Sequence, residues 1–166
     1  MKLKHIILVL LSSALFIGCT PTPNTTLTTA TIKKNIVGTW HSKSMHRTRD
    51  AVTIRSKSTD TFYRNGTLLS TEYLTYVGKR GKILGKMRYK RYFKWRVYGS
   101  VIRTTFKSCS SRILKRPRSS KVGFVTDVLN AACKYANRKP GRTSKSEKIY
   151  YISGHKLVVR GKTLYR

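Results

Sequence analysis

An alternation of apolar and basic residues between positions 86 and 98 constrains the fold more than any other feature. Met87, Tyr89, Phe93, Trp95 and Val97 fall on one side, and Lys86, Arg88, Lys90, Tyr92, Lys94, Arg96 and Tyr98 fall on the other. Successive side chains of a strand point to opposite faces, so the segment predicts a strand with one core face and one basic, aromatic face. Arg91 interrupts the apolar side, and we interpret it as a bend or a turn.

Tight turns separate this strand from several others. Asn65-Gly66, after Thr61–Arg64, is a strong hairpin signal because both residues tolerate positive φ. Glycine turns at 78–81, 99–100, 154–155 and 161–162 divide the rest of the chain into short β-prone runs. In the run 67–77 we place the odd-numbered residues, beginning with Leu69, on the core face. The pattern predicts a mainly β fold, an antiparallel sandwich or barrel of about eight to ten strands.

One segment has a helical rather than a β period. Apolar residues recur at helical spacing from Val122 to Ala136, through Val125, Leu129 and Ala132, and Ser120 is available as an N-cap. We therefore expect one helix near 122–136. Basic loops flank it on both sides.

Three motifs in order resemble the lipocalins and related calycins. Gly38-Thr39-Trp40 resembles their Gly-x-Trp entry, and Thr61-Phe62-x-x-Asn65-Gly66-Thr67 resembles a hairpin of small bacterial lipocalin-like domains. The strand that holds Phe93-Lys94-Trp95 fits the same plan. The resemblance covers about residues 36–166 and implies an up-and-down antiparallel barrel with Trp40 at its closed end. The expected barrel core contains Trp40, Phe62, Leu69, Phe93 and Trp95.

The N-terminus has the layout of a secretory signal peptide. Lys2 and Lys4 precede an apolar stretch from Ile6 to Ile17, and Gly18-Cys19 follows. The stretch is shorter than the roughly 20 residues that a spanning helix needs. An ordinary signal peptide that ends near a cysteine is one interpretation. The other is a resemblance to the lipobox of bacterial lipoproteins, which implies cleavage before Cys19 and acylation of its thiol.

This resemblance divides the chain into a signal peptide (1–18), a lipidated cysteine with a flexible Thr/Pro-rich tether (19–31) and a barrel domain (32–166). Thr20 follows the cysteine, where aspartate favours retention in the inner membrane. The expected location is therefore the outer membrane, facing the periplasm, or the cell surface if the source is Gram-positive.

Charge is the strongest indication of a partner. The formal net charge is +31, and removal of Lys2 and Lys4 with the leader lowers it to +29. We expect an anionic partner in the envelope: lipid head groups, peptidoglycan, lipopolysaccharide, an acidic protein or, as a weaker alternative, nucleic acid. A solvated basic surface without a dedicated partner is the other interpretation. The candidate anion-binding residues are Lys79, Arg80, Lys90, Lys94, Arg96, Lys115, Arg116, Arg118, Arg138, Lys139 and Arg142, with Tyr92 and Tyr98 as candidate stacking residues.

Cys109 and Cys133 remain after Cys19. In an oxidising compartment they are expected to form a disulfide across 24 residues, worth roughly 3 kcal/mol in the chain-entropy model. Two separate buried thiols are the alternative.

The sequence offers no catalytic or metal-binding constellation. The five acidic residues Asp50, Asp60, Glu72, Asp127 and Glu147 are scattered, and His41, His46 and His155 lack the spacing of a metal site. We therefore expect a non-catalytic binding module without a cofactor or metal. The alternatives are a carrier of a small apolar ligand in the barrel interior and an envelope nucleic-acid-binding protein.

Overall fold

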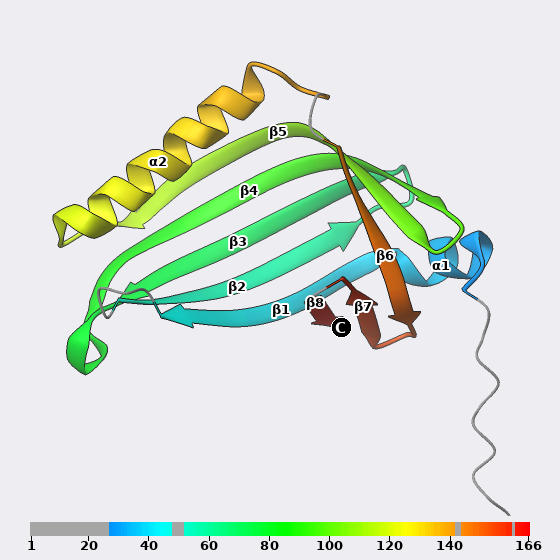
Figure 1. The fold of residues 1–166 in the computed structure, drawn as a ribbon, viewed down its shortest axis with the longest axis horizontal. Coiled ribbons are helices and arrows are strands. Elements are labelled where there is room, and N and C mark those ends of the chain that lie inside the picture. The colour runs from blue at the N-terminus through cyan, green and yellow to red at the C-terminus, as the bar shows by residue number, and fades with distance from the viewer. Residues whose placement is uncertain (1–26, 48–51, 142–143, 161) are drawn as a thin grey trace, which may run out of the picture.

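The computed structural model describes residues 27–47, 52–141, 144–160 and 162–166, and they form a closed barrel of eight antiparallel strands (Figure 1). Each strand pairs with the next, and β8 returns to β1. The strands are β1 (Gly38–Arg47), β2 (Thr53–Phe62), β3 (Thr67–Val77), β4 (Ile83–Tyr98), β5 (Val101–Lys115), β6 (Ser144–Ile152), β7 (Lys156–Val159) and β8 (Lys162–Tyr165). The helices are α1 (Thr29–Ile36), η1 (Lys79–Gly81) and α2 (Ser120–Asn137). The expected mainly β, up-and-down barrel is confirmed.

The predicted hairpin at Asn65-Gly66 is present. Tyr63 N–H donates to the Thr67 carbonyl at 2.8 Å, and Thr67 N–H donates to Asn65 Oδ1 at 3.0 Å. Gly66 alone in this turn takes a positive φ, 79°, which explains why a glycine stands there.

The strands are of unequal length, and this shapes the barrel. The strands from β1 to β5 have 10 to 16 residues, whereas β7 and β8 have 4 each. β6 pairs with β5 only opposite Val101–Thr105. All eight strands therefore surround one end of the barrel, which we call the closed end, where α1 and the 63–66 and 99–100 turns also lie (Figure 1). Beyond it, the five long strands continue as a curved sheet.

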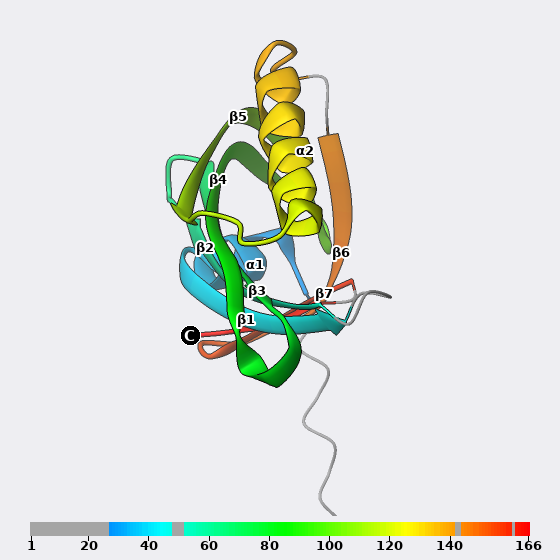
Figure 2. The same cartoon turned by 90° about the vertical axis from the view of Figure 1, so that its left-hand side faces the viewer.

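Helix α2 lies along the part of β5 that has no strand partner on that side (Figures 1 and 2). Cys109 N–H donates to Asn137 Oδ1 at 2.7 Å, and Asn137 Nδ2 donates to the Cys109 carbonyl at 2.8 Å. The Asn137 amide thus replaces one pair of strand hydrogen bonds, because an amide offers the same donor and acceptor as a peptide group. The predicted Cys109–Cys133 disulfide joins the same two elements, with an S–S distance of 2.04 Å.

The predicted helix exists, but only some of the apolar residues whose spacing predicted it are buried. Val122, Thr126 and Cys133 are buried against the sheet, whereas Val125 is 37% exposed and Ala132 is also exposed. Ser119 rather than Ser120 caps it, accepting from Val122 N–H at 3.3 Å. Apolar residues occur on both sides of this helix, with Phe124 and Tyr135 exposed. Composition alone therefore could not indicate which side packs on β5.

The main core fills the closed end. Trp40 is fully buried there, and its Nε1 donates to the Ile36 carbonyl at 2.7 Å. The Arg166 guanidinium lies 4.2 Å from the Trp40 ring centroid. Gly38 has a φ of 127°, and a Cβ there would lie 2.9 Å from the Arg166 side chain. The φ of Gly38 is the reason for a glycine two residues before Trp40, because the Arg166 side chain could shift to make room for a Cβ.

Helix α1 was not expected. It begins at Thr29, three residues before the predicted domain boundary at 32, and Ile32 and Ile36 are fully buried in the core of the closed end. The predicted leader (1–18), Cys19 and the tether up to residue 26 lie outside the described residues.

The other predicted core residues are mostly confirmed. Phe62 and Trp95 are buried and meet edge to face, with ring centroids 5.7 Å apart. Phe93 is partly buried against the same core. Leu69 is a wrong prediction: Leu68 is the buried neighbour, opposite Phe93, and Leu69 lies on the outer face. Both faces of β3 carry large apolar residues, so the sequence did not define the phase of the alternation.

Arg91 does not mark a turn, because β4 continues through it as one strand. Its neighbours in register are Ser70 and Cys109, which are both buried. Arg91 therefore lies on the inner face of the sheet, where it meets a carboxylate.

We expect the double variant Cys109→Ala/Cys133→Ala to unfold with a free energy lower by roughly 3 kcal/mol, because the unfolded chain regains the freedom of a 24-residue loop. Urea denaturation of the variant, and of the wild-type protein with and without reductant, measures this. Reduced wild-type protein keeps both side chains and is the matched control. An unchanged midpoint in both tests contradicts the prediction.

Candidate anion-binding surface

The barrel holds most of its described carboxylates on its inner face. Of the four acidic residues that the structure describes, three lie on the inner face: the side chains of Asp60, Glu72 and Glu147 are 13%, 26% and 25% exposed. Asp60 lies opposite Trp40 and Ser70, and Glu147 lies opposite Ile102. Asp127, on α2, is the exposed one. Residues scattered in sequence are thus collected inside the barrel.

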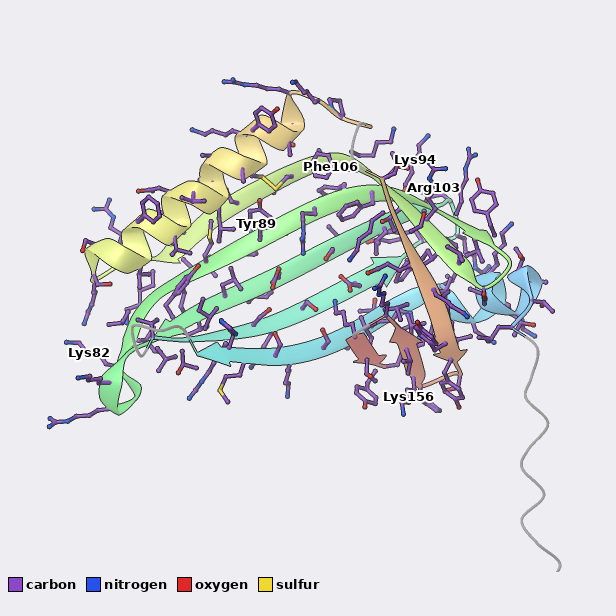
Figure 3. All side chains as sticks on the ribbon, in the orientation of Figure 1. Lys82, Tyr89, Lys94, Arg103, Phe106 and Lys156 are labelled. Atoms are coloured by element: carbon purple, nitrogen blue, oxygen red, sulfur yellow. A yellow bond between two sulfur atoms is a disulfide. The ribbon has the colours of Figure 1, made fainter. Side chains whose placement is uncertain are left out.

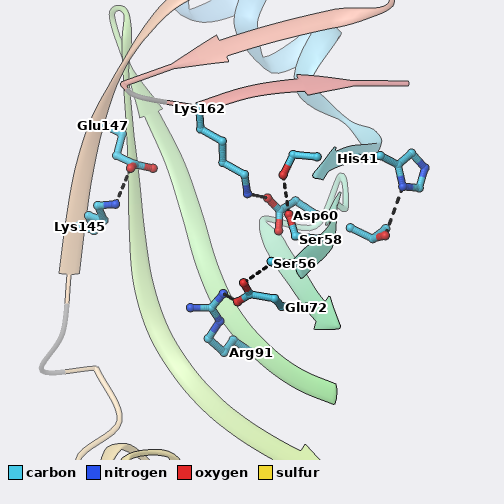
Figure 4. Close-up of polar contacts among 11 residues, drawn as sticks. His41, Ser56, Ser58, Asp60, Glu72, Arg91, Lys145, Glu147 and Lys162 are labelled. Carbon is cyan, nitrogen blue, oxygen red and sulfur yellow. Dashed lines mark hydrogen bonds and ion pairs between the residues drawn. The ribbon is translucent and has the colours of Figure 1, made fainter. Parts of the chain in front are cut away.

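Each inner carboxylate is paired locally (Figure 4). Lys162 Nζ lies 2.9 Å from Asp60 Oδ2, and Arg91 Nη2 lies 3.2 Å from Glu72 Oε2. Ser56 Oγ donates to Glu72 Oε1 at 2.6 Å. Three ion pairs are defined among the described residues, the third being Lys145–Glu147. The carboxylates are therefore not available to neutralise the outer surface.

Two tyrosines beside this network have perturbed acidity. Burial raises the pKa of Tyr76, and the negative charge of Glu72 raises it further. Burial also raises the pKa of Tyr89, and Glu72 adds to this, while the Arg91 guanidinium acts in the opposite direction. Both hydroxyls therefore stay protonated at neutral pH.

The outer face of the long strands places like charges side by side. Lys43 pairs in register with Lys57, Arg88 with Arg112, Lys86 with Lys115 and Arg96 with Arg103. No ion pair links any of these eight cations to a carboxylate among the described residues. We define the convex basic face by eleven outer cations of β1 to β5 that have a partner in strand register: Lys43, Arg55, Lys57, Lys86, Arg88, Lys90, Lys94, Arg96, Arg103, Arg112 and Lys115.

Such an arrangement weakens the fold. Like charges directly opposite each other on a sheet are destabilising, by part of a kcal/mol for each pair. The sheet repeats this pairing four times, and an anion bound across a pair would remove the repulsion.

Two hollows adjoin this face at the closed end. A cleft of about 880 Å³ lies between α1, the 63–66 turn and the end of β4, and Lys33, Lys34, Arg64 and Arg96 line it. A smaller groove of about 180 Å³ crosses β4 and β5 and is lined by Lys94, Arg96, Tyr98, Arg103, Thr105 and Lys107. Figure 3 labels Lys94 and Arg103 near each other on these two strands. Arg96 and Tyr98 line both hollows.

The predicted cations do not form one site. Lys90, Lys94 and Arg96 lie on the convex basic face. Lys115, the last residue of β5, belongs to the same face. Lys79 and Arg80 in η1, and Arg116 and Arg118 after β5, lie at the end opposite the cleft, where Arg118 N–H donates to the Leu84 carbonyl at 2.7 Å. Arg138 and Lys139 follow α2, and Arg142 lies outside the described residues.

The candidate stacking residues are solvent-accessible. Tyr92 is 38% exposed and Tyr98 is 56% exposed, both on the outer face of β4. In the described part of the chain, neither ring has a cation over it, whereas Tyr135, Tyr150 and Tyr151 do. Tyr98 contributes to the cleft, and Tyr92 does not.

Sequence reasoning missed several cations of this surface. Arg103 could have been found from the 99–100 turn, because a two-residue turn sets Val101 opposite Tyr98 on the same face and Arg103 lies two residues further on. Lys107 lies at a register shift of β5, which the sequence did not indicate. Lys33 and Lys34 were missed because α1 was not expected, and Arg64 because its turn was interpreted only as a connection.

No protein-family model and no curated protein matches this chain. The described residues contain no group of three or more potential metal ligands. Nor does that part of the chain include a helix with the length and apolar character needed to cross a membrane.

We expect Arg112→Gln to raise the free energy of unfolding by about 0.2–1 kcal/mol at low salt, because it removes the repulsion from Arg88. The gain should disappear near 1 M salt, where the Debye length is about 3 Å. Urea denaturation at both salt concentrations measures this. Arg112→Lys, which keeps the charge, is the control, and a loss of stability in Arg112→Gln at low salt contradicts the prediction.

Alkaline pH should destabilise the barrel through Tyr76. Its pKa is raised in the folded state, so the unfolded chain loses the proton first as the pH passes about 10. The free energy of unfolding therefore falls as pH rises through this range, and it falls less in Tyr76→Phe. Denaturation at pH values of about 9 and 11 tests this. Tyr73→Phe, at an exposed position, is the control and should follow the wild type.

Proposed function

We propose that this chain is a lipid-anchored envelope lipoprotein with a lipocalin-like barrel, whose convex basic face binds an anionic component of the cell envelope without catalysis. The segregation of charge carries the proposal: the inner face holds three of the four described carboxylates, and the outer face repeats like-charge pairs without neutralising partners.

The anchor is inferred from the sequence. Lys2, Lys4, the apolar stretch 6–17 and Gly18-Cys19 resemble a lipoprotein leader. Acylation of Cys19 with more than one chain would give stable attachment, because a single chain binds a membrane only marginally. Thr20 favours the outer membrane, facing the periplasm.

The lipocalin-like relationship is supported by the barrel and by its closed end. The strand order follows an eight-stranded meander, and Trp40 of the Gly-x-Trp motif is buried near the start of β1, under Arg166. Gly38 of the same motif has a φ of 127°, a backbone conformation that favours glycine.

The interior of the barrel is poorly suited to carrying an apolar ligand, and this supports a function of the outer surface instead. The closed end is filled by apolar side chains, and the cavity there is about 80 Å³ and is lined partly by Asp60, Glu147 and Lys162. Pockets for drug-sized ligands are typically 300–1,000 Å³. Toward the middle, the inner face carries Glu72 and Arg91, which do not suit an apolar ligand.

The binding test uses purified protein with lipopolysaccharide and with peptidoglycan sacculi, at salt concentrations of about 0.05 M and 0.5 M. We expect binding that weakens steeply with salt. The variant Lys43→Gln/Lys57→Gln/Arg88→Gln/Arg112→Gln should lose at least tenfold in affinity, because four adjacent cations of one face are removed.

The matched control removes four cations away from that face: Lys134→Gln/Lys139→Gln/Lys148→Gln/Lys156→Gln. It should lose much less affinity. Equal losses would show that only net charge matters and would remove the convex basic face as the site. Absent or salt-independent binding would overturn the anion-binding function. Stronger, chain-length-dependent binding to single-stranded DNA would favour nucleic acid as the partner.

Lipidation is tested separately. We expect cells that express the chain to incorporate labelled palmitate into it and to carry it in the membrane fraction, and Cys19→Ala to lose both properties. Palmitate incorporation that survives in Cys19→Ala contradicts the assignment.

A further inference from the structure

The cleft at the closed end combines cations with apolar walls. Lys33, Lys34, Arg64 and Arg96 are exposed along it, and no ion pair of the described residues involves them. Val37, Trp95, Val97 and Tyr98 form its apolar part. Because the cleft encloses cations together with apolar side chains, it is suited to an anion that also carries apolar groups.

The cleft also lies where the N-terminal segment joins the barrel. Helix α1 begins at Thr29, with Thr28 as its N-cap, and Leu27 packs against the core. Gly99 N–H donates to Thr29 Oγ1 at 2.9 Å, which fixes the start of the helix to the β4–β5 hairpin. Helix α1, which carries Lys33 and Lys34, is therefore held in place beside the end of β4, which forms the other side of the cleft.

The remaining chain between the anchor and this end is short. Eight residue steps separate Cys19 from Leu27, and a fully extended chain covers about 3.6 Å per residue. An acylated Cys19 would therefore keep Leu27 within about 29 Å of the bilayer surface. A chain of this length would let the closed end contact the bilayer surface, and it would keep the closed end from moving far from that surface.

We propose that the cleft binds anionic phospholipid head groups of the leaflet that holds the Cys19 acyl chains, so that the barrel rests on the membrane by its closed end. This inference rests on the proposed lipid anchor and deepens the proposed anion binding by naming the lipid. Phosphates would meet Lys33, Lys34, Arg64 and Arg96. The exposed ring of Tyr98 would enter the head-group layer, where amphipathic rings are favoured.

The number of cations in the cleft sets how strongly it would bind an anionic membrane. Each Lys or Arg near an anionic surface contributes about 1 kcal/mol, or about fivefold in affinity, within a Debye length. Four such cations would bias the orientation of an already anchored barrel strongly. They would not by themselves replace the anchor.

The experiment uses the lipidated full protein reconstituted in neutral phosphatidylcholine vesicles or in vesicles that also contain phosphatidylglycerol. Lysine acylation followed by mass spectrometry measures the exposure of each amine. We expect Lys33 and Lys34 to react at least fivefold more slowly in the anionic vesicles at low salt, and to recover at high salt. Lys43 and Lys57, on the convex basic face, should react equally in both vesicles.

Two charge-matched variants give the control. Arg64→Gln/Arg96→Gln should abolish the protection of Lys33 and Lys34, whereas Arg88→Gln/Arg112→Gln should retain it. Circular dichroism checks that both variants fold. Loss of protection in both folded variants would show a general charge effect and would overturn the assignment of the cleft.

Two further outcomes overturn the inference. Lys33 and Lys34 could react equally in neutral and anionic vesicles. Alternatively, millimolar glycerol phosphate could protect them as well as anionic vesicles do, which would identify a soluble phosphate ester as the ligand. If either occurs while lipopolysaccharide or sacculi still bind with steep salt dependence, only the lipid assignment fails and the proposed function stands.

Discussion

The placement of carboxylates inside the barrel is the constraint on which the other features of this protein depend. Asp60, Glu72 and Glu147 are held by Lys162, Arg91 and Lys145, so these acids do not neutralise the outside. The outer face of β1 to β5 is left with cations opposite cations. Opposite charges interleaved on that face would give a more stable sheet with a weaker attraction for anions. The observed arrangement costs stability, and the proposed binding of an anion would offset that cost.

The barrel tolerates this repulsion because other contacts hold its wall together. Helix α2 takes the place of a strand beside the free part of β5, through the Asn137 amide and the Cys109–Cys133 disulfide. At the other end, the Trp40 ring lies between α1 and Arg166 and closes the core where the short strands β7 and β8 complete the ring. The long strands therefore need not be stabilised by their outer side chains.

The two basic regions differ in what they suit. The convex basic face is an open, repeating array, which suits a polymer or a layer with many negative groups. The closed-end cleft has apolar walls and adjoins the start of the described chain, which suits a lipid head group. With both occupied, the barrel would be held to the membrane at one end and would present its array to another envelope component.

The sequence by itself determined the strand character of the chain, the hairpins and the helix after β5, because each depends on a local period or a turn residue. It favoured the Cys109–Cys133 disulfide but left two separate thiols open, and the structure shows the bond. It also determined the outward direction of Lys90, Lys94 and Arg96, since a strand alternates. It did not determine which face of β3 is inner, and Leu69 was therefore predicted on the wrong face. It did not predict helix α1 either. Only the tertiary structure placed the dispersed acids inside and aligned like charges across strands. Register and closure bring together residues more than 80 positions apart, such as Asp60 and Glu147, which both line one cavity, and no local pattern encodes that distance.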